Sequence, residues 1–501
     1  MLTLVRDGAM RENVLVFSSE SDLFGHGELV LTLARGHEHL SALYEFELTL
    51  EVHREGGLAH DAVRALLARP CSIHQADEAG SAEVHGMLAE LRMVAAVEGS
   101  PVTYRAVLVP RLWKTTRQLN SRVFQDVTVA ELVDRVLEFS GLRAEWRLSR
   151  DYPRLEYVVQ FEESDFAFVS RQLEHWGIWY YFRQEPDGEI LVIGDHNRGF
   201  EPIPDRDTLS FSPRLGRSGV RGCVHHLGSI HRLPEAVVTV RDYNYLTPSG
   251  AIETKRDVEP GGAPGFGLRR YYGDHFRDED EAKVIAQVRA EQLLNRCELY
   301  EGICSVPGLA PGHTFELLEC PIPELNITYL VTSVAPSLGV TGDHGDEAYE
   351  YRFTAVPLER DEPAPVTFRP QRVTARPRIT GFMHGVIDGE VPGTAAPIDE
   401  QGRYKVVLPL DSGTWPKAKA SRWIRMIQPS SGAGYGIHFP LHIGTEVAII
   451  HLDGDPDRPV ILGAVPNPAT TSPVVQANAT QSRIKTSTGI VFELDDDVGP
   501  A

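Results

Sequence analysis

Phe161-Glu-Glu-Ser-Asp-Phe-Ala-Phe-Val-Ser-Arg-Gln-Leu-Glu-His-Trp-Gly-Ile-Trp-Tyr-Tyr-Phe182 is the most informative stretch of this 501-residue sequence. A helix is expected to begin after Ser164 and to end at Gly177, because apolar residues recur at helical spacing and glycine readily closes a helix. The chain then continues into two strands, Ile178–Phe182 and Glu189–Ile193, which a Pro-Asp-Gly turn joins into a hairpin. The residues that the helix turns inward are Phe168, Val169 and Leu173.

Short strands dominate the sequence on both sides of this stretch. They are rich in β-branched and aromatic residues and partly alternate between apolar and polar, as half-buried strands do. Two further helices are expected, one capped by the Thr128-Val-Ala-Glu131 box and ending at Gly141, the other over Asp280–Arg296. The sequence therefore predicts a mainly β fold with a few helices. The clearest strands are Glu28–Ala34, Leu43–Leu50, Tyr104–Val109 and Ala236–Arg241.

The chain length is typical of about three domains of roughly 150 residues each. Four prolines among charged residues between Asp361 and Arg378 predict a stiff, extended linker. Short strands and turns follow from Gly381 to about Pro468, and the chain becomes small and polar after Pro473.

Composition narrows the possible partners and compartments. The chain carries 49 Lys and Arg against 70 Asp and Glu, which gives a net charge of −21. Because an acidic surface repels phosphate backbones, we do not expect nucleic acid as a partner. Five widely spaced cysteines predict no disulfide framework and indicate folding in a reducing cytoplasm. The N-terminus lacks the apolar core of a signal peptide, and no apolar run is long enough to span a membrane. We therefore expect that any export depends on another machine.

Several short patterns suggest metal sites but lack the necessary spacing. His37-Glu-His-Leu-Ser41 has serine where a helical zinc-protease motif requires its second histidine. Cys223, His225, His226 and His231 have no second ligand pair. Asp453-Gly-Asp-Pro-Asp-Arg-Pro459 lacks the closing glutamate of a calcium loop and is better interpreted as a tight turn. No metal ligand is nominated.

Enzyme signatures are equally weak. Gly432-x-Gly434-x-Gly436 lacks the spacing and the following helix of a dinucleotide loop, and Pro440 comes soon after it. The sequence contains no Gly-x-Ser-x-Gly elbow and no phosphate-binding loop. We therefore nominate no catalytic residue and no cofactor, and expect a protein that is not an enzyme.

Taken in order, the segments resemble the VgrG family, the spike of the type VI secretion system. The resemblance runs over nearly the whole chain, and a series of ordered motifs is far more specific than any one motif. The N-terminal matches are Gly36–Leu48, Asn120–Asp126, Phe161–Phe182, Val240–Ser249 and Tyr351–Val356. The C-terminal matches are Asp399–Val406, Trp423–Arg425, Gly434–Gly436, His442–Val447, Gly454–Val460 and Asn478–Thr486.

The resemblance implies a domain order. A phage-hub-like region with several β-barrel subdomains and helices is expected over residues 1–370, followed by a linker at 371–380. An OB-fold β-barrel is expected over 381–470, and the neck with the first strands of a trimeric β-helix needle over 471–501. Family members usually continue with many more strands after this neck, whereas the sequence given stops at Ala501.

The resemblance also implies partners and a location. We expect a homotrimer, made in the cytoplasm without a signal peptide, assembled into the injection machine and exported to the extracellular space or a target cell. Its partners would be an Hcp-like inner-tube ring and the baseplate, with a PAAR-type tip protein and effectors if a needle is present. The residues expected to make trimer or needle contacts are Ile484, Ile490, Val491 and Phe492.

Three other hypotheses remain open at this point. The same hub would serve an extracellular contractile injection system or a phage tail, which the sequence does not distinguish. A different class would be a cell-wall hydrolase, for which no segment is left over, or an OB-type ligand-binding protein. The aromatic and basic residues that would suit such a ligand are Tyr404, Lys405, Trp415, Lys417, Lys419 and Trp423.

Overall fold

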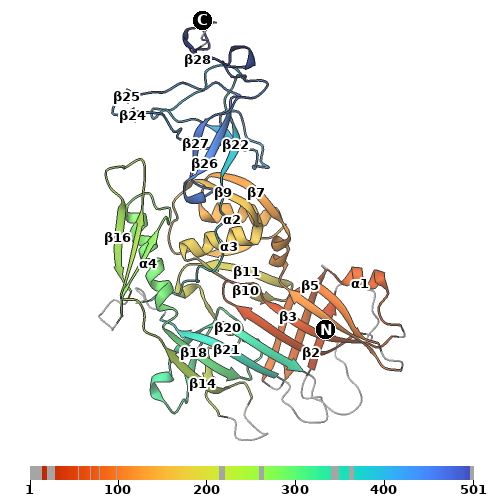
Figure 1. Cartoon of the computed structure of the whole chain (residues 1–501). Helices are drawn as coiled ribbons and strands as arrows, with labels where there is room; N and C mark the ends of the chain where they lie inside the picture. Colours follow the sequence, from red (N-terminus) through yellow and green to blue (C-terminus); the bar gives the residue numbers. More distant parts are fainter. Residues whose placement is uncertain are drawn as a thin grey trace. The chain divides into compact units, whose positions relative to one another are not determined.

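The chain folds into two compact units in a computed structural model (Figure 1). Unit 1 comprises Met1–Gln118, Val133–Tyr152 and Asp165–Thr374, and unit 2 comprises Leu119–Leu132, Pro153–Ser164 and Ala375–Ala501. The structure describes residues 14–19, 29–54, 56–67, 69–77, 79–96, 99–213, 221–258, 265–339, 349–359 and 366–496. Strands far outnumber helices in both units, which confirms the predicted mainly β fold.

A thirteen-stranded sheet forms the centre of unit 1. Its core face is apolar because the strands alternate: in β3 the side chains of Phe46, Leu48 and Leu50 are buried, whereas Glu45 and Glu47 are exposed. The main path runs, in order, through β1 (Val14–Ser19), β4 (Pro70–Asp77), β5 (Gly80–Ala95), β6 (Val102–Val109), β3 (Glu45–Val52), β2 (Leu29–His39), β20 (Thr328–Gly339), β21 (Tyr349–Pro357), β18 (Glu298–Cys304) and β14 (Val224–His231). Off this path, β19 (His313–Leu318) pairs with β20, β12 (Glu201–Pro202) and β13 (Thr208–Ser210).

A smaller sheet in unit 1 contains the predicted hairpin. β10 (Trp179–Glu185) pairs with β11 (Gly188–Gly194), which also pairs with β8 (Ala144–Arg147). The preceding helix α3 (Asp165–Trp176) ends at Gly177, whose φ of +69° and close neighbours leave little room for a side chain. The Ile178 amide donates to the Leu173 carbonyl at 2.9 Å, so the glycine stop was predicted correctly.

A third sheet of unit 1 has one face covered by a helix. β15 (Val237–Asp242) lies between β16 (Ile252–Asp257) and β17 (Leu268–Tyr272), and α4 (Glu279–Leu294) packs on β16 and β15 (Figure 1). The Asp278 carboxylate caps α4 by accepting from the backbone amides of the helix's first turn. Helix α1 (His60–Leu66) was not expected from the sequence.

The expected capping box begins helix α2 (Val129–Glu138). The Thr128 hydroxyl accepts from the Glu131 amide at 3.2 Å, and the Glu131 carboxylate accepts from the Thr128 amide at 3.1 Å. Short 3-10 turns occur at Arg111–Arg117, Asn197–Gly199, Pro323–Leu325, Leu452–Gly454 and Gln476–Asn478.

Unit 2 combines strands from distant parts of the sequence. The pair β7 (Leu119–Val127) and β9 (Leu155–Ser164) contributes Val123, Tyr157 and Val159 to one apolar core with residues beyond position 380. The Val159 amide donates to the Asp457 carboxylate at 2.6 Å. The remaining strands of this unit are β22 (Phe382–Ile387), β23 (Val406–Val407), β24 (Ser431–Gly432), β25 (Tyr435–Gly436), β26 (Glu446–His451), β27 (Pro459–Ala464), β28 (Gln481–Lys485) and β29 (Val491–Asp495).

The described part of the proline-rich segment packs against unit 1. The Arg369 guanidinium is buried and donates to the Glu291 carboxylate at 2.7 Å and to the carbonyls of Gly177 and Asp195. The Glu174 carboxylate accepts from the amides of Val373 and Thr374. Residues 368–374 therefore form a docked strap on unit 1, whereas 361–365 lie outside the described residues.

Candidate assembly surface

The four residues predicted to make trimer or needle contacts all lie on one hairpin of unit 2. Strands β28 and β29 pair antiparallel, and the turn between them is closed by the Thr486 amide, which donates to the Ile490 carbonyl at 2.9 Å. Ile484 is 47% exposed and Phe492 is 61% exposed, and Ile490 and Val491 are exposed as well. A two-stranded hairpin without a covered apolar face is marginally stable by itself.

The register of the hairpin separates its two faces. Ile484 pairs with Phe492 and Ser482 with Leu494, so these side chains share one face. Arg483 pairs with Glu493 on the opposite face, where their side chains form an ion pair. Val491 lies on the charged face and Ile490 in the turn, a distinction that the sequence did not reveal.

The four-stranded sheet of unit 2 presents a second apolar surface. Its order is β23-β22-β26-β27, and the inward face carries Ile387, Val447 and Ile449. The outward face carries the exposed side chains of Phe382, Val386, Val407 and Ile450, which the register places on neighbouring strands. They form two cross-strand neighbour pairs, Phe382 with Ile450 and Val386 with Val407.

A charged pair lies on the same outward face. The His384 imidazole contacts the Glu446 carboxylate at 2.6 Å, and the Asn467 amide donates to that carboxylate at 2.7 Å. The Asn467 hydrogen bond and the adjacent His384 lower the pKa of Glu446. This outward face therefore combines apolar side chains with an ionised carboxylate.

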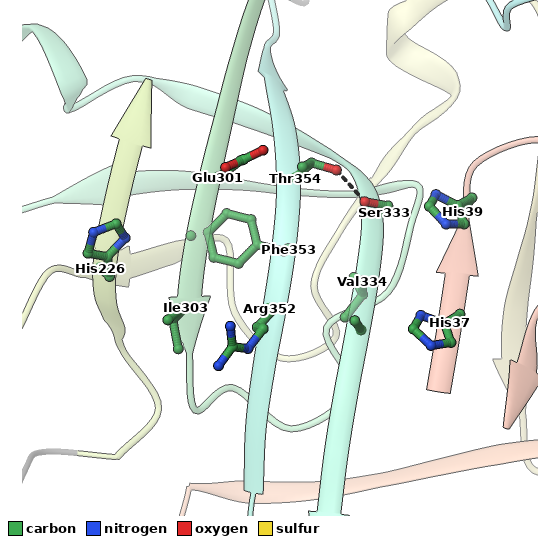
Figure 2. Close-up of a pocket in the computed structure, with 12 residues that line it drawn as sticks. His37, His39, His226, Glu301, Ile303, Ser333, Val334, Arg352, Phe353 and Thr354 are labelled. Carbon is green, nitrogen blue, oxygen red and sulfur yellow. Dashed lines mark hydrogen bonds between the residues drawn. The ribbon is translucent and has the colours of Figure 1, made fainter. Parts of the chain in front are cut away.

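Unit 1 carries a hollow of about 350 Å³ on the outward face of its large sheet, lined by both polar and apolar side chains (Figure 2). The hollow exists because β20 contributes the small side chains Ser333 and Ala335 between larger ones on the strands beside it. His37 and His39 of β2 form one side and His226 of β14 the other, and Arg352 of β21 lies between them. Its lining shows no nucleophile paired with a base.

The motif histidines do not lie on a helix. His37 and His39 point outward from strand β2, while Glu38 between them is buried in the core. Burial raises the pKa of Glu38 to about 8.

The Asp453–Pro459 segment forms the predicted tight turn between β26 and β27. The Asp455 amide donates to the Leu452 carbonyl, and the Arg458 amide donates to the Asp455 carbonyl.

The residues proposed for an OB-type ligand are engaged with their own unit. Tyr404 is fully buried, and the Trp415 indole donates to the Asp411 carboxylate at 2.5 Å. The Lys405 ammonium lies 5.1 Å from the centre of the Trp423 ring, and Lys417 donates to the Glu390 carbonyl at 3.1 Å. These contacts favour structural roles for Tyr404, Lys405, Trp415, Lys417 and Trp423.

Two family models match the chain. The model of the phage tail baseplate hub (GPD) matches residues 37–339, and that of the type VI secretion system/phage-baseplate injector OB domain matches residues 392–465. In the described part of the chain, no helix is both long and apolar enough to cross a membrane.

Curated relatives carry spike names. The type VI secretion system spike protein VgrG1a of Pseudomonas aeruginosa is 31% identical over 92% of this chain and 71% of its own length. VgrG4b of the same organism is 30% identical over 94% of this chain and 58% of its own length. The actin cross-linking toxin VgrG1 of Vibrio cholerae is 27% identical over 77% of this chain, which spans only 35% of that protein. The chain thus spans about three fifths of the first curated relatives.

Solved structures share the fold. The E. coli c3393 protein, a type VI secretion component described as similar to bacteriophage T4 gp27 and gp5, aligns with a TM-score of 0.65 at 22% identity. That alignment covers 90% of this chain and 100% of the other. A chain of the half-lidded Francisella PdpA-VgrG complex aligns with a TM-score of 0.64 at 10% identity, over 97% of this chain and 83% of the other.

Proposed function

The chain belongs to the VgrG family of type VI secretion spike proteins, and from this membership we propose that three copies form the hub and neck of a spike at the tip of a contractile injection machine. The observation that carries the trimer is the β28–β29 hairpin. Its apolar face, with Ile484, Phe492 and Leu494, is exposed in the single chain. Three such faces that meet on a common axis bury one another, which gives the hairpin the core that it lacks.

The role proposed for the chain is mechanical. The family models cover the hub and the OB domain, which are the parts that position a spike, and the matched relatives VgrG1a and VgrG4b are named spike proteins. We assign no enzymatic activity to this chain. Zymography of the purified protein on peptidoglycan tests this assignment, and a lytic band that persists through purification would contradict it.

The proposed partners follow from the position at the tip. The hub would dock on an Hcp-like inner-tube ring and on the baseplate, and a PAAR-type tip protein and effectors would join where a needle continues beyond the neck. The injection machine would carry the protein out of the cell. Copurification of the full chain with an Hcp-like ring tests the first contact.

Oligomeric state is the decisive measurement. Light scattering on the full chain should give three times the monomer mass at concentrations above the dissociation constant, since assembly follows mass action. A chain that stays monomeric at the highest attainable concentration would contradict the proposal. A dilution series separates a weak trimer from a true monomer.

A further inference from the structure

The small sheet of unit 1 ends in an uncovered edge. β17 pairs with β15 on one side, and no other described strand pairs with it. In the part of the chain that the structure describes, the outer side of β17 is therefore not paired with another strand. An exposed edge strand offers a ready template for another extended chain.

Apolar side chains lie along this edge. Tyr271 turns toward α4, where the Arg289 guanidinium stacks 4.0 Å from the centre of its ring. Because side chains alternate along a strand, Leu268, Arg270 and Tyr272 share the other face, and all three are exposed. Phe266, just before the strand, is 81% exposed. Apolar contacts thus flank a cation at the centre of the strand.

The charge of the edge opposes that of the whole chain. β17 contains Arg269 and Arg270 and no acidic residue, although the chain has a net charge of −21. Arg269 pairs with Glu235 at 2.7 Å, whereas Arg270 has no ion-pair partner among the described residues. Its guanidinium is therefore available to an incoming carboxylate.

Self-association through this edge is disfavoured by the same residue. Two copies of β17 that pair antiparallel about a two-fold axis would centre on Arg270 and place one Arg270 opposite the other. Like charges directly opposite each other destabilise a strand pair. An acidic strand of a different protein has the complementary charge.

We propose that β17 is a docking edge for an extended acidic segment of another protein, which adds to the sheet as a fourth strand. A carboxylate of that segment pairs with Arg270, and apolar side chains two residues to either side rest on Leu268 and Tyr272. Backbone hydrogen bonds to β17 supply affinity, and the alternating side chains supply specificity. The proposal does not rest on the trimer proposed above.

The test uses the full chain and a labelled peptide, acetyl-Thr-Val-Thr-Glu-Thr-Val-Thr-amide, with fluorescence anisotropy as the readout. Binding should weaken at least about tenfold in Arg270→Glu, equal to roughly 1.4 kcal/mol. The peptide with lysine in place of glutamate should show the reverse preference and bind Arg270→Glu more tightly than the unmodified protein. Light scattering should give the same mass for both proteins.

Two controls distinguish strand addition from general charge attraction. Lys255→Glu makes the same charge change on β16, at the opposite edge of the sheet, and should leave peptide affinity unchanged. N-methylation of alternate peptide amides that would face β17 should abolish binding, because it removes the donors of the strand ladder. Absence of binding by the glutamate peptide, an equal loss in Lys255→Glu, or full binding by the methylated peptide would overturn the proposal.

Discussion

The large sheet of unit 1 and the β28–β29 hairpin of unit 2 are both β structure, but they differ in whether their apolar side chains are buried within the chain. In the sheet, Phe46, Leu48 and Leu50 are buried within the same chain. In the hairpin, Ile484, Phe492 and Leu494 face outward. Unit 1 thus buries its own apolar side chains, whereas the apolar face of the hairpin is exposed in the single chain and, as proposed above, is covered by other copies. From this comparison we expect that stability and assembly can be perturbed separately in this protein.

The largest expected effect tests the self-sufficiency of unit 1. Arg369→Ala leaves the buried Glu291 carboxylate without its charged partner, and losing one partner of a buried pair costs about 3–5 kcal/mol. Chemical denaturation of unit 1 should show this loss. The matched control Arg352→Ala breaks an exposed pair with Glu350 and should cost less than about 1 kcal/mol. Equal effects of the two changes would show that the Arg369–Glu291 pair does not hold the strap.

A pH series tests the buried carboxyl group of Glu38, which lies on β2 of the large sheet. The pKa of Glu38 is raised to about 8, so the native state keeps a proton that the unfolded chain releases above about pH 4.3. The unfolded state therefore binds fewer protons in this window, and stability falls as pH rises toward 8. Glu38→Gln should remove this slope and stabilise unit 1 at pH 8 by about 3 kcal/mol or more, since one pKa unit corresponds to about 1.36 kcal/mol.

The control for this series is the neighbouring exposed Glu47, whose change to Gln should leave the slope in place. Denaturation midpoints between pH 5 and pH 8 are the readout. A slope that persists unchanged in Glu38→Gln would contradict the assignment.

Removal of the hairpin tests the dependence of assembly on unit 2. A chain that stops after Pro473 lacks β28 and β29 and should associate at least about a hundredfold more weakly, roughly 2.7 kcal/mol. The melting of unit 1, measured in the monomer, should stay the same. Sedimentation at several concentrations decides the first point. If the truncated chain trimerises as tightly as the full one, then the trimer contacts lie in the rest of the molecule and not in the hairpin.

The smallest expected effect comes from a comparison of the two faces of the hairpin. Ile484→Asp places a charge on the apolar face, and burying it in a shared core should weaken association about tenfold, close to 1.4 kcal/mol. Val491→Asp makes the same kind of change on the charged face and should have a smaller effect. If Val491→Asp is the more damaging variant, then the opposite face of the hairpin points toward the other copies.

Local features of the fold could be predicted because they depend on neighbouring residues. The stop at Gly177 and the box of Thr128 and Glu131 involve residues a few positions apart, and both are present. The packing of Val123 and Tyr157 with residues beyond position 380 was not foreseen. Hydrophobic periodicity shows which face of a strand is buried but not which distant strand covers it.

The residues of the candidate assembly surface could be chosen from the sequence only in part, because local sequence does not show how strands pair. Ile484, Ile490, Val491 and Phe492 could be chosen as apolar residues in a polar tail, and their role in a trimer stays a prediction. Their division between two faces depends on the strand register, which places Ile484 opposite Phe492 and Val491 opposite Lys485. The His37-Glu-His segment was tested only against a helical motif, whereas its strand conformation sends the histidines and Glu38 to opposite sides.

The docked strap determines how unit 1 would respond to traction. A pull on the chain from residue 375 onward reaches first the Glu174 carboxylate, which holds the amides of Val373 and Thr374. The next anchor is Arg369, with its buried partner Glu291 and two backbone carbonyls. The strands of the large sheet lie behind these anchors along the chain. In the contractile machine proposed above, tension along this segment would therefore meet a short row of charged hydrogen bonds before it reached a strand of the large sheet.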